Sequence, residues 1–290
     1  MTKNYPHITR RCFVNAPLEQ LEAGLLDTFL RHDLQPEIGL EWNELASFSR
    51  EQGVRISTAL RDRGLACTLH APFFDLAPGA GDPDILAATR AKLGRAFDLL
   101  PVFQPRAVVC HLGYDDKQHR GRQEQWLRNS LATWWELLGR AAALAIPVHF
   151  ENTYEYGPEH HVRLLTALGM DNAGFCLDVG HALAFGREPL DIWIEALHPW
   201  LRQLHLHDND GTWDEHRAIG SGKVDFQLLL QELERYALQP IVTLEPHSEL
   251  DLWGSLAALD KPEYGSLLNE IPRTVPPPSL VTPGACPCRR

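Results

Sequence analysis

The stretch LRQLHLHDNDGTWDEH, residues 201–216, is where the sequence is most informative about the fold. It holds three histidines and four acidic residues in sixteen positions, and its first half alternates apolar and polar residues as a half-buried strand does. His205 and His207 would share one face, because side chains two apart on a strand point the same way. Imidazoles and carboxylates that meet at a strand end can bind zinc or manganese. The alternative is a solvated acidic loop, so matching ligands are needed at other strand ends.

Short apolar runs alternate with amphipathic stretches along most of the chain. The apolar runs predict strands over residues 11–15, 36–40, 66–70, 107–112, 147–151, 174–178, 203–207 and 241–245. The stretches between them predict helices, such as those over residues 18–31, 84–103, 123–145 and 226–237. This alternation predicts an α/β fold, a single-domain (β/α)8 TIM barrel. A doubly wound open sheet is the alternative, and the lack of a G-x-G-x-x-G motif after the first strand disfavours it.

The composition of the 290-residue chain is that of a soluble globular protein, with 44% hydrophobic and 22% charged residues. Its formal net charge of -11 argues against a broad phosphate-binding face. Without a secretory signal or an apolar run of transmembrane length, we expect a cytoplasmic protein with reduced cysteines and no membrane contact. The proline-rich residues 272–290 predict a disordered tail after a barrel over residues 1–271.

Metal-type ligands stand near the C-terminal ends of six consecutive predicted strands, the end where TIM barrels build their active sites. In chain order they are His70, His111, Glu151, Asp178 with His181, His205 with His207, Asp214 and His216 in the following loop, and Glu245. One such residue alone would more often be structural. Together, unpaired charges would repel one another and lose hydration, so a bound cation explains them best. The mixed nitrogen and oxygen shell suits Mn²⁺, Zn²⁺, Co²⁺ or Mg²⁺.

The motifs at these strand ends resemble those of the xylose-isomerase-like TIM-barrel superfamily, which holds sugar isomerases and epimerases as well as endonuclease IV. Across residues 66–246 they follow the family's order, as HAPF, CHLGY, FENT, LDVGH, LHLHDND, DEHRAIGSG and LEP. The match is specific for the superfamily and much less so for any one of its members. It implies a barrel enzyme that depends on a divalent metal.

The sugar-isomerase branch implies one metal held by Glu151, Asp178, His205 and Glu245. Its reaction would isomerise or epimerise a small sugar or related hydroxy-carbonyl compound through an enediolate, with Glu151 and Glu245 as the acid/base pair. A metal would lower the pKa of the α-proton and stabilise the developing oxyanion. By the same resemblance His181 would bind substrate hydroxyls, and His205 rather than His207 would be the ligand from the seventh strand.

The endonuclease IV branch implies three zinc ions and hydrolysis of a phosphodiester at abasic DNA. Each of its nine ligand positions has a matching residue here, namely His70, His111, Glu151, Asp178, His181, His205, Asp214, His216 and Glu245. Three features count against this branch. The chain is acidic, the loop EWNELASF lacks the basic or wedge-like side chains that duplex DNA would favour, and Ser221 replaces the family's usual glutamate.

We therefore expect a metal-dependent sugar isomerase or epimerase, with an endonuclease IV-like phosphodiesterase as the alternative. The first would bind a small sugar-like molecule, and only the second would bind nucleic acid; an oligomer is compatible with both. A barrel that binds metal or sugar without turnover is a third possibility, which the intact acid/base pair disfavours. Phe73 and Phe74 closely follow the motif histidine His70, so we expect them to form a hydrophobic wall beside the substrate.

Overall fold

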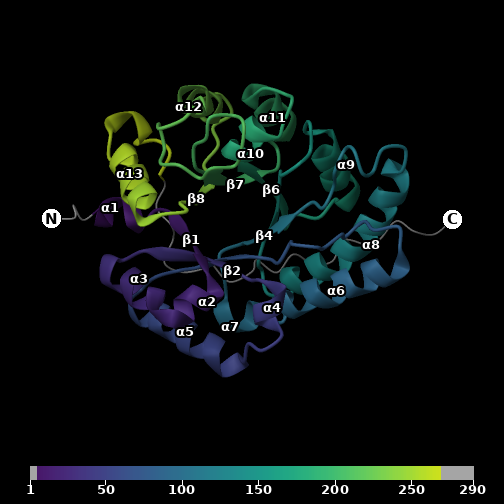
Figure 1. Ribbon diagram of the computed structural model, residues 1–290, viewed down its shortest axis with the longest axis horizontal. Coiled ribbons are helices and arrows are strands. Elements are labelled where there is room, and N and C mark those ends of the chain that lie inside the picture. Colours follow the sequence, from purple (N-terminus) through teal and green to yellow (C-terminus); the bar gives the residue numbers. More distant parts are fainter. Residues whose placement is uncertain (1–4, 269–290) are drawn as a thin grey trace.

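The computed structural model describes residues 5–268, apart from the side chain of Trp42, as a closed barrel of parallel strands (Figure 1). The strands follow one another around the barrel in chain order, and β1 closes the ring by pairing with β8. They are β1 (Phe13–Pro17), β2 (Gln35–Gly39), β3 (Thr68–His70), β4 (Val108–His111), β5 (Val148–Glu151), β6 (Ala173–Asp178), β7 (Leu201–Leu206) and β8 (Ile241–Leu244). The predicted (β/α)8 TIM barrel is confirmed, and the doubly wound sheet is excluded.

Helices surround the strands, and one α-helix and a short 3-10 helix follow the last strand (Figure 1). They are α1 (Pro6–Thr9), α2 (Leu18–Gln20), η1 (Leu21–Leu25), α3 (Leu26–His32), α4 (Trp42–Leu45), α5 (Arg50–Asp62), α6 (Pro83–Phe97), α7 (Leu100–Phe103), α8 (Gln123–Ala142), α9 (Glu159–Leu168), α10 (Val179–Ala184), α11 (Leu190–Leu197), α12 (Phe226–Arg235), α13 (Glu249–Leu259) and η2 (Pro262–Tyr264).

Two of the predicted helices are interrupted. The helix predicted over residues 18–31 contains the π-helical segment η1, in which Gly24 adopts a φ of 119°. Only glycine adopts such a conformation readily, so the kink is located at this residue. The helix predicted over residues 84–103 ends at Phe97, and α7 starts anew with Pro101 in its first turn. Proline lacks the N–H that a helix interior requires but is tolerated in a first turn.

A polar layer fills the barrel one step below the C-terminal strand ends. The Oε2 atom of Glu37 accepts hydrogen bonds from Thr68 Oγ1 at 2.7 Å, Gln203 Nε2 at 2.7 Å and Thr243 Oγ1 at 3.1 Å. The three donors come from β3, β7 and β8, and each lies two residues before a predicted site residue, which is on the same strand for β3 and β7 and directly after the strand for β8. All four side chains are buried, so these bonds are needed to offset the desolvation of the carboxylate. This layer forms the floor of the site.

Other predictions concern the C-terminal tail, the cysteines and membrane contact. The predicted proline-rich tail, residues 272–290, lies outside the described residues, so the tail and the domain boundary at residue 271 stay predictions. Cys12, Cys67, Cys110 and Cys176 are buried free thiols. Between residues 5 and 268, no helix is long and apolar enough to cross a membrane.

The loop between β7 and α12, which carries Asp214, is organised around the buried carboxylate of Asp208. Its Oδ2 accepts hydrogen bonds from the backbone N–H groups of Gly220 at 3.0 Å and Gly222 at 2.8 Å. Its Oδ1 accepts another from Val224 at 3.0 Å. A Cβ on Gly222 would lie 2.4 Å from Asp208 Oδ1, so only glycine fits there. One side chain thus sets the path of the loop.

Replacing Asp208 with alanine should lower the free energy of unfolding by about 2–4 kcal/mol, because three backbone N–H groups of the loop lose their charged, buried acceptor. Urea denaturation of Asp208→Ala and of the parent protein measures the difference. Asp210→Ala is the matched control, since the Asp210 side chain accepts hydrogen bonds from Thr212 within its own turn. Equal losses of stability in both variants would contradict the role given to Asp208.

Candidate metal centre

The ten side chains predicted from the sequence all lie together at the C-terminal end of the barrel. They form three groups, and within each group one ligand atom per residue lies within 4.8 Å of the others. The first group is His70, His111 and Glu151; the central group is Glu151, Asp178, His205 and Glu245; the loop group is His181, His207, Asp214 and His216. Glu151 belongs to two groups. Which of these residues hold a metal stays a prediction.

His205 directs one ring nitrogen at the carboxylates of the central group. Its Nδ1 lies 3.1 Å from Glu245 Oε1, 3.3 Å from Glu151 Oε1 and 3.9 Å from Asp178 Oδ2. The ring is completely buried. Within the described part of the chain this Nδ1 makes no hydrogen bond of suitable geometry.

The opposite nitrogen of His205 explains the orientation of the ring. His205 Nε2 lies 2.8 Å from Oε1 of Glu37, on β2. A neutral imidazole has only one N–H, and a carboxylate can only accept. The two atoms, Nε2 and Oε1, form a close polar contact, and Glu37 Oε1 makes no hydrogen bond of suitable geometry within the described residues. If the ring proton is on Nε2, next to the Glu37 carboxylate, Nδ1 presents a bare lone pair to three carboxylates. An unprotonated Nδ1 facing three carboxylates requires a proton or a cation between them, and metal-binding histidines commonly have a carboxylate next to their second ring nitrogen.

Three more histidines have one ring nitrogen committed to a backbone carbonyl. The Nδ1 atoms of His70, His181 and His216 lie 2.9, 3.0 and 2.7 Å from the carbonyl oxygens of Ala71, Asn152 and Glu245. In a neutral ring each Nδ1–H therefore donates outward, which leaves Nε2 unprotonated. His70 Nε2 lies 3.0 Å from Glu151 Oε2, and those of His181 and His216 lie 3.1 and 2.9 Å from Asp214 Oδ2. The donor sets of all three groups therefore fit bound cations.

His207 connects the central and loop groups. Its Nε2 lies 3.0 Å from Asp178 Oδ1 and 3.5 Å from Asp214 Oδ1, and its ring stacks on His216 at 3.9 Å. The His207 ring packs closely against the backbone at Gly180, because a Cβ at that position would lie 2.0 Å from the ring. The strand pattern could not distinguish His205 from His207, and in the structure the two rings serve different groups.

The electrostatic environments of Glu151 and Glu245 differ. Burial alone would raise the pKa of Glu151, but its interactions with His205 and His111 outweigh burial and hold the pKa well below its usual range. For Glu245, burial dominates over His205 and raises the pKa. Burial also lowers the pKa of His111 to about 4, so this ring is neutral at pH 7. Opposite shifts in two neighbouring carboxylates are typical of active sites.

Sequence reasoning missed Glu37, Asn152 and Glu155. Glu37 lies within a predicted strand, and a charged residue in a buried strand was the available signal. The Asn152 side chain accepts from the backbone N–H of Asp178 and donates to its carbonyl, both at 2.9 Å, which joins the ends of β5 and β6. Glu155 is buried in the following loop, and this burial raises its pKa to about 8; nothing in the sequence pattern marked it.

A fourth set of metal-type side chains, Asp116, Glu159 and His160, lies outside the predicted site. His160 Nε2 lies 3.7 Å from Asp116 Oδ1 and 4.0 Å from Glu159 Oε1. Glu159 is exposed, and exposed acidic groups commonly gather without a metal. We therefore assign no role to this set.

Comparison with known proteins identifies the family. A family model described as a xylose isomerase-like TIM barrel matches residues 35–263, and the chain belongs to that family. An uncharacterized protein of Methanocaldococcus jannaschii is 28% identical over 236 residues, which are 76% of this chain and 77% of the relative. A protein named probable endonuclease 4, of Mycobacterium leprae, is 27% identical over 187 residues, which are 59% of this chain and 69% of the relative.

Solved structures share the fold. A D-tagatose 3-epimerase-like protein superposes with a TM-score of 0.73 at 22% identity, covering 85% of this chain and 95% of its own. A protein from Thermus thermophilus, studied after soaking with ZnCl2, gives a TM-score of 0.68 at 24% identity, covering 87% of this chain and 99% of its own. At these identities the likeness concerns the fold alone.

Glu37→Gln should weaken divalent-metal binding by about 10- to 100-fold, because an amide neither carries the charge nor fixes the proton position of His205. Competition with a chelating dye, with Zn²⁺ or Mn²⁺, measures the affinity. Glu232→Gln is the control, since Glu232 is also buried but lies on α12 and contacts Arg235. An unchanged affinity in Glu37→Gln would remove Glu37 from the support of the site.

Proposed function

We propose that this protein is a divalent-metal-dependent enzyme that holds more than one metal ion and hydrolyses a phosphodiester or closely related ester. The proposal rests on the Glu151 carboxylate, whose two oxygens face different groups. Its Oε1 lies 3.3 Å from His205 Nδ1, whereas its Oε2 lies 3.0 and 3.2 Å from the Nε2 atoms of His70 and His111. A carboxylate with one oxygen in each of two ligand sets suits a pair of metal ions.

The groups differ in the metal that they suit. When bound, clustered metal ions lower the pKa of water and stabilise the attacking and leaving oxygens of a displacement. The loop group, with three imidazoles and one carboxylate, suits tetrahedral zinc. The central group, with three carboxylates and one imidazole, suits Zn²⁺ or Mn²⁺. Around these groups the chain fixes the rings through Glu37 and the backbone carbonyls, so little reorganisation is needed for binding.

The substrate we propose is a small molecule rather than duplex DNA. The chain has a formal net charge of -11, and enzymes that bind a duplex rely on lysine and arginine contacts to phosphates. Similarity to a protein named probable endonuclease 4 supports the hydrolytic chemistry. The negative net charge favours a ligand with one or two phosphates over a polyanion.

Elemental analysis of the purified protein should give two or three metal ions per chain. Hydrolysis of bis(p-nitrophenyl) phosphate should disappear on chelation and return with Zn²⁺ or Mn²⁺. Asp214→Asn should remove about one metal ion per chain without changing the circular dichroism, because Asp214 faces both His181 and His216. One metal ion per chain together with no phosphodiester hydrolysis would exclude this function.

A second candidate is isomerisation or epimerisation of a small sugar or related hydroxy-carbonyl compound. The central group favours it, because Glu151 and Glu245 both lie within 3.3 Å of His205 Nδ1 and could remove and return a proton beside a carbonyl. A single metal in this group would stabilise the oxyanion that develops. The fold shared with a D-tagatose 3-epimerase-like protein also supports this candidate.

If the second candidate is right, Glu245→Gln should abolish the solvent deuterium exchange that the parent protein catalyses into a ketose such as D-tagatose. The loss follows from removing one of the two proton-transferring carboxylates. Proton NMR in deuterated buffer measures the exchange, and Glu232→Gln should retain it. Exchange that persists in Glu245→Gln would show that the acid/base assignment is wrong.

A further inference from the structure

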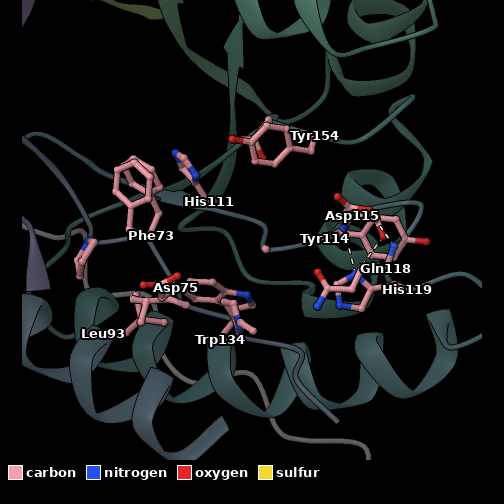
Figure 2. A pocket seen from close by; sticks show the side chains of 17 residues that line it. Phe73, Asp75, Leu93, His111, Tyr114, Asp115, Gln118, His119, Trp134 and Tyr154 are labelled. Atoms are coloured by element: carbon pink, nitrogen blue, oxygen red, sulfur yellow. Dashed lines mark hydrogen bonds between the residues drawn. The ribbon is translucent and has the colours of Figure 1, made fainter. Parts of the chain in front are cut away.

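A pocket of about 270 Å³ opens beside the first group, between the loops that follow β3 and β4 (Figure 2). His111 lines the pocket and also belongs to the first group, where its Nε2 lies 3.2 Å from Glu151 Oε2. Phe73 stacks on the His111 ring with centroids 4.0 Å apart. The pocket is therefore continuous with the candidate metal centre.

Aromatic side chains gather around this opening without being buried. Phe74 and Tyr154, which line the pocket, are 60% and 57% exposed. Beyond Tyr154 the rings continue through Phe185, at 5.0 Å, to Trp213, at a further 6.2 Å, and Trp213 is 67% exposed. We call Phe74, Tyr154, Phe185 and Trp213 the aromatic rim. Exposed apolar surface concentrated at a site commonly marks where a ligand binds.

The same pocket also has polar lining residues. Asp75 lies near Leu93, whereas Asp115 and Gln118 lie with Tyr114 and His119 on another side of the pocket (Figure 2). Asp115 Oδ1 accepts hydrogen bonds from the backbone N–H groups of Lys117 and Gln118 at 2.7 and 2.8 Å, which fixes its carboxylate in place. The lining thus offers carboxylates on two sides and an amide beside one of them. Carboxylates only accept hydrogen bonds, so this lining suits a ligand that carries N–H donors.

We infer that this pocket binds a flat, nitrogen-containing aromatic ring of the substrate, while the ester bond lies at the metal centre. The position of the ester bond rests on the proposed function; the ring site does not. Aromatic side chains can stack on any heteroaromatic ring, because every such ring has a π face. Pockets that enclose drug-sized ligands typically measure roughly 300–1,000 Å³. A pocket of about 270 Å³ therefore fits one ring system rather than a polymer.

Adenosine is the probe for the pocket, because it has a nitrogen-rich ring and no phosphodiester, and D-ribose is its counterpart without a ring. In titration calorimetry the parent protein should bind adenosine and should not bind D-ribose at the same concentrations. Phe74→Ala and Tyr154→Ala should each weaken adenosine binding about ten-fold, because each removes one stacking partner. Trp135→Ala is the matched control. Trp135 is also exposed, at 49%, but it lies on α8, where its indole N–H donates a hydrogen bond to the carbonyl oxygen of Leu168.

Three results would overturn the inference: no binding of adenosine, equal binding of D-ribose, or an affinity that neither rim variant changes. The measurement is independent of catalysis, because adenosine has no bond for the proposed hydrolysis. Weakened adenosine binding in the rim variants, with no hydrolysis of bis(p-nitrophenyl) phosphate, would support the ring site and remove the proposed function. Hydrolysis without adenosine binding would remove the ring site alone.

Discussion

The contact between the Glu37 carboxylate and Nε2 of His205 is the interaction on which the rest of the site depends. Glu37 is anchored in the middle of the barrel by hydrogen bonds from β3, β7 and β8. Because its position is fixed from three strands, the His205 ring is held with Nδ1 toward Glu151 and Glu245. A buried charge is a poor source of stability, since its desolvation offsets what its contacts contribute. The buried polar side chains of this barrel are therefore better explained by their role in orienting the site residues than by a contribution to stability.

Backbone carbonyl groups orient three of the other imidazole rings in the same way. Carbonyl oxygens at the ends of strands and in the loops beyond them accept the Nδ1–H groups of three histidines, so their Nε2 atoms face inward. Parallel strands present their last residues on one face of the barrel, which brings these rings together from distant parts of the chain. The loop that Asp208 organises, which follows β7, adds Asp214 and His216 to the site. The site is thus an assembly of oriented nitrogens around a few carboxylates.

Members of one family can isomerise sugars or hydrolyse phosphodiesters on the same barrel, so the fold alone does not decide the reaction. The central group is compatible with both chemistries. The first and loop groups are what favour several metal ions, and Glu151 joins the first group to the central one. The aromatic rim adds a feature that neither chemistry requires. It points to the identity of the substrate rather than to the reaction.

The sequence by itself determined the barrel and which ten metal-type side chains lie together at its C-terminal end, because strand period and strand ends are local patterns. His70 and Glu245 could be assigned to the same end of the barrel from the sequence, since a TIM barrel brings all C-terminal strand ends to one face. Only the tertiary structure decided which ring nitrogens face inward, how the ten side chains divide into groups, and that Glu37 contacts His205. Glu37 and Thr243 are 206 residues apart and meet only when the barrel closes. Such contacts, and the conformations of the loops that carry the aromatic rim, depend on packing that no local pattern records.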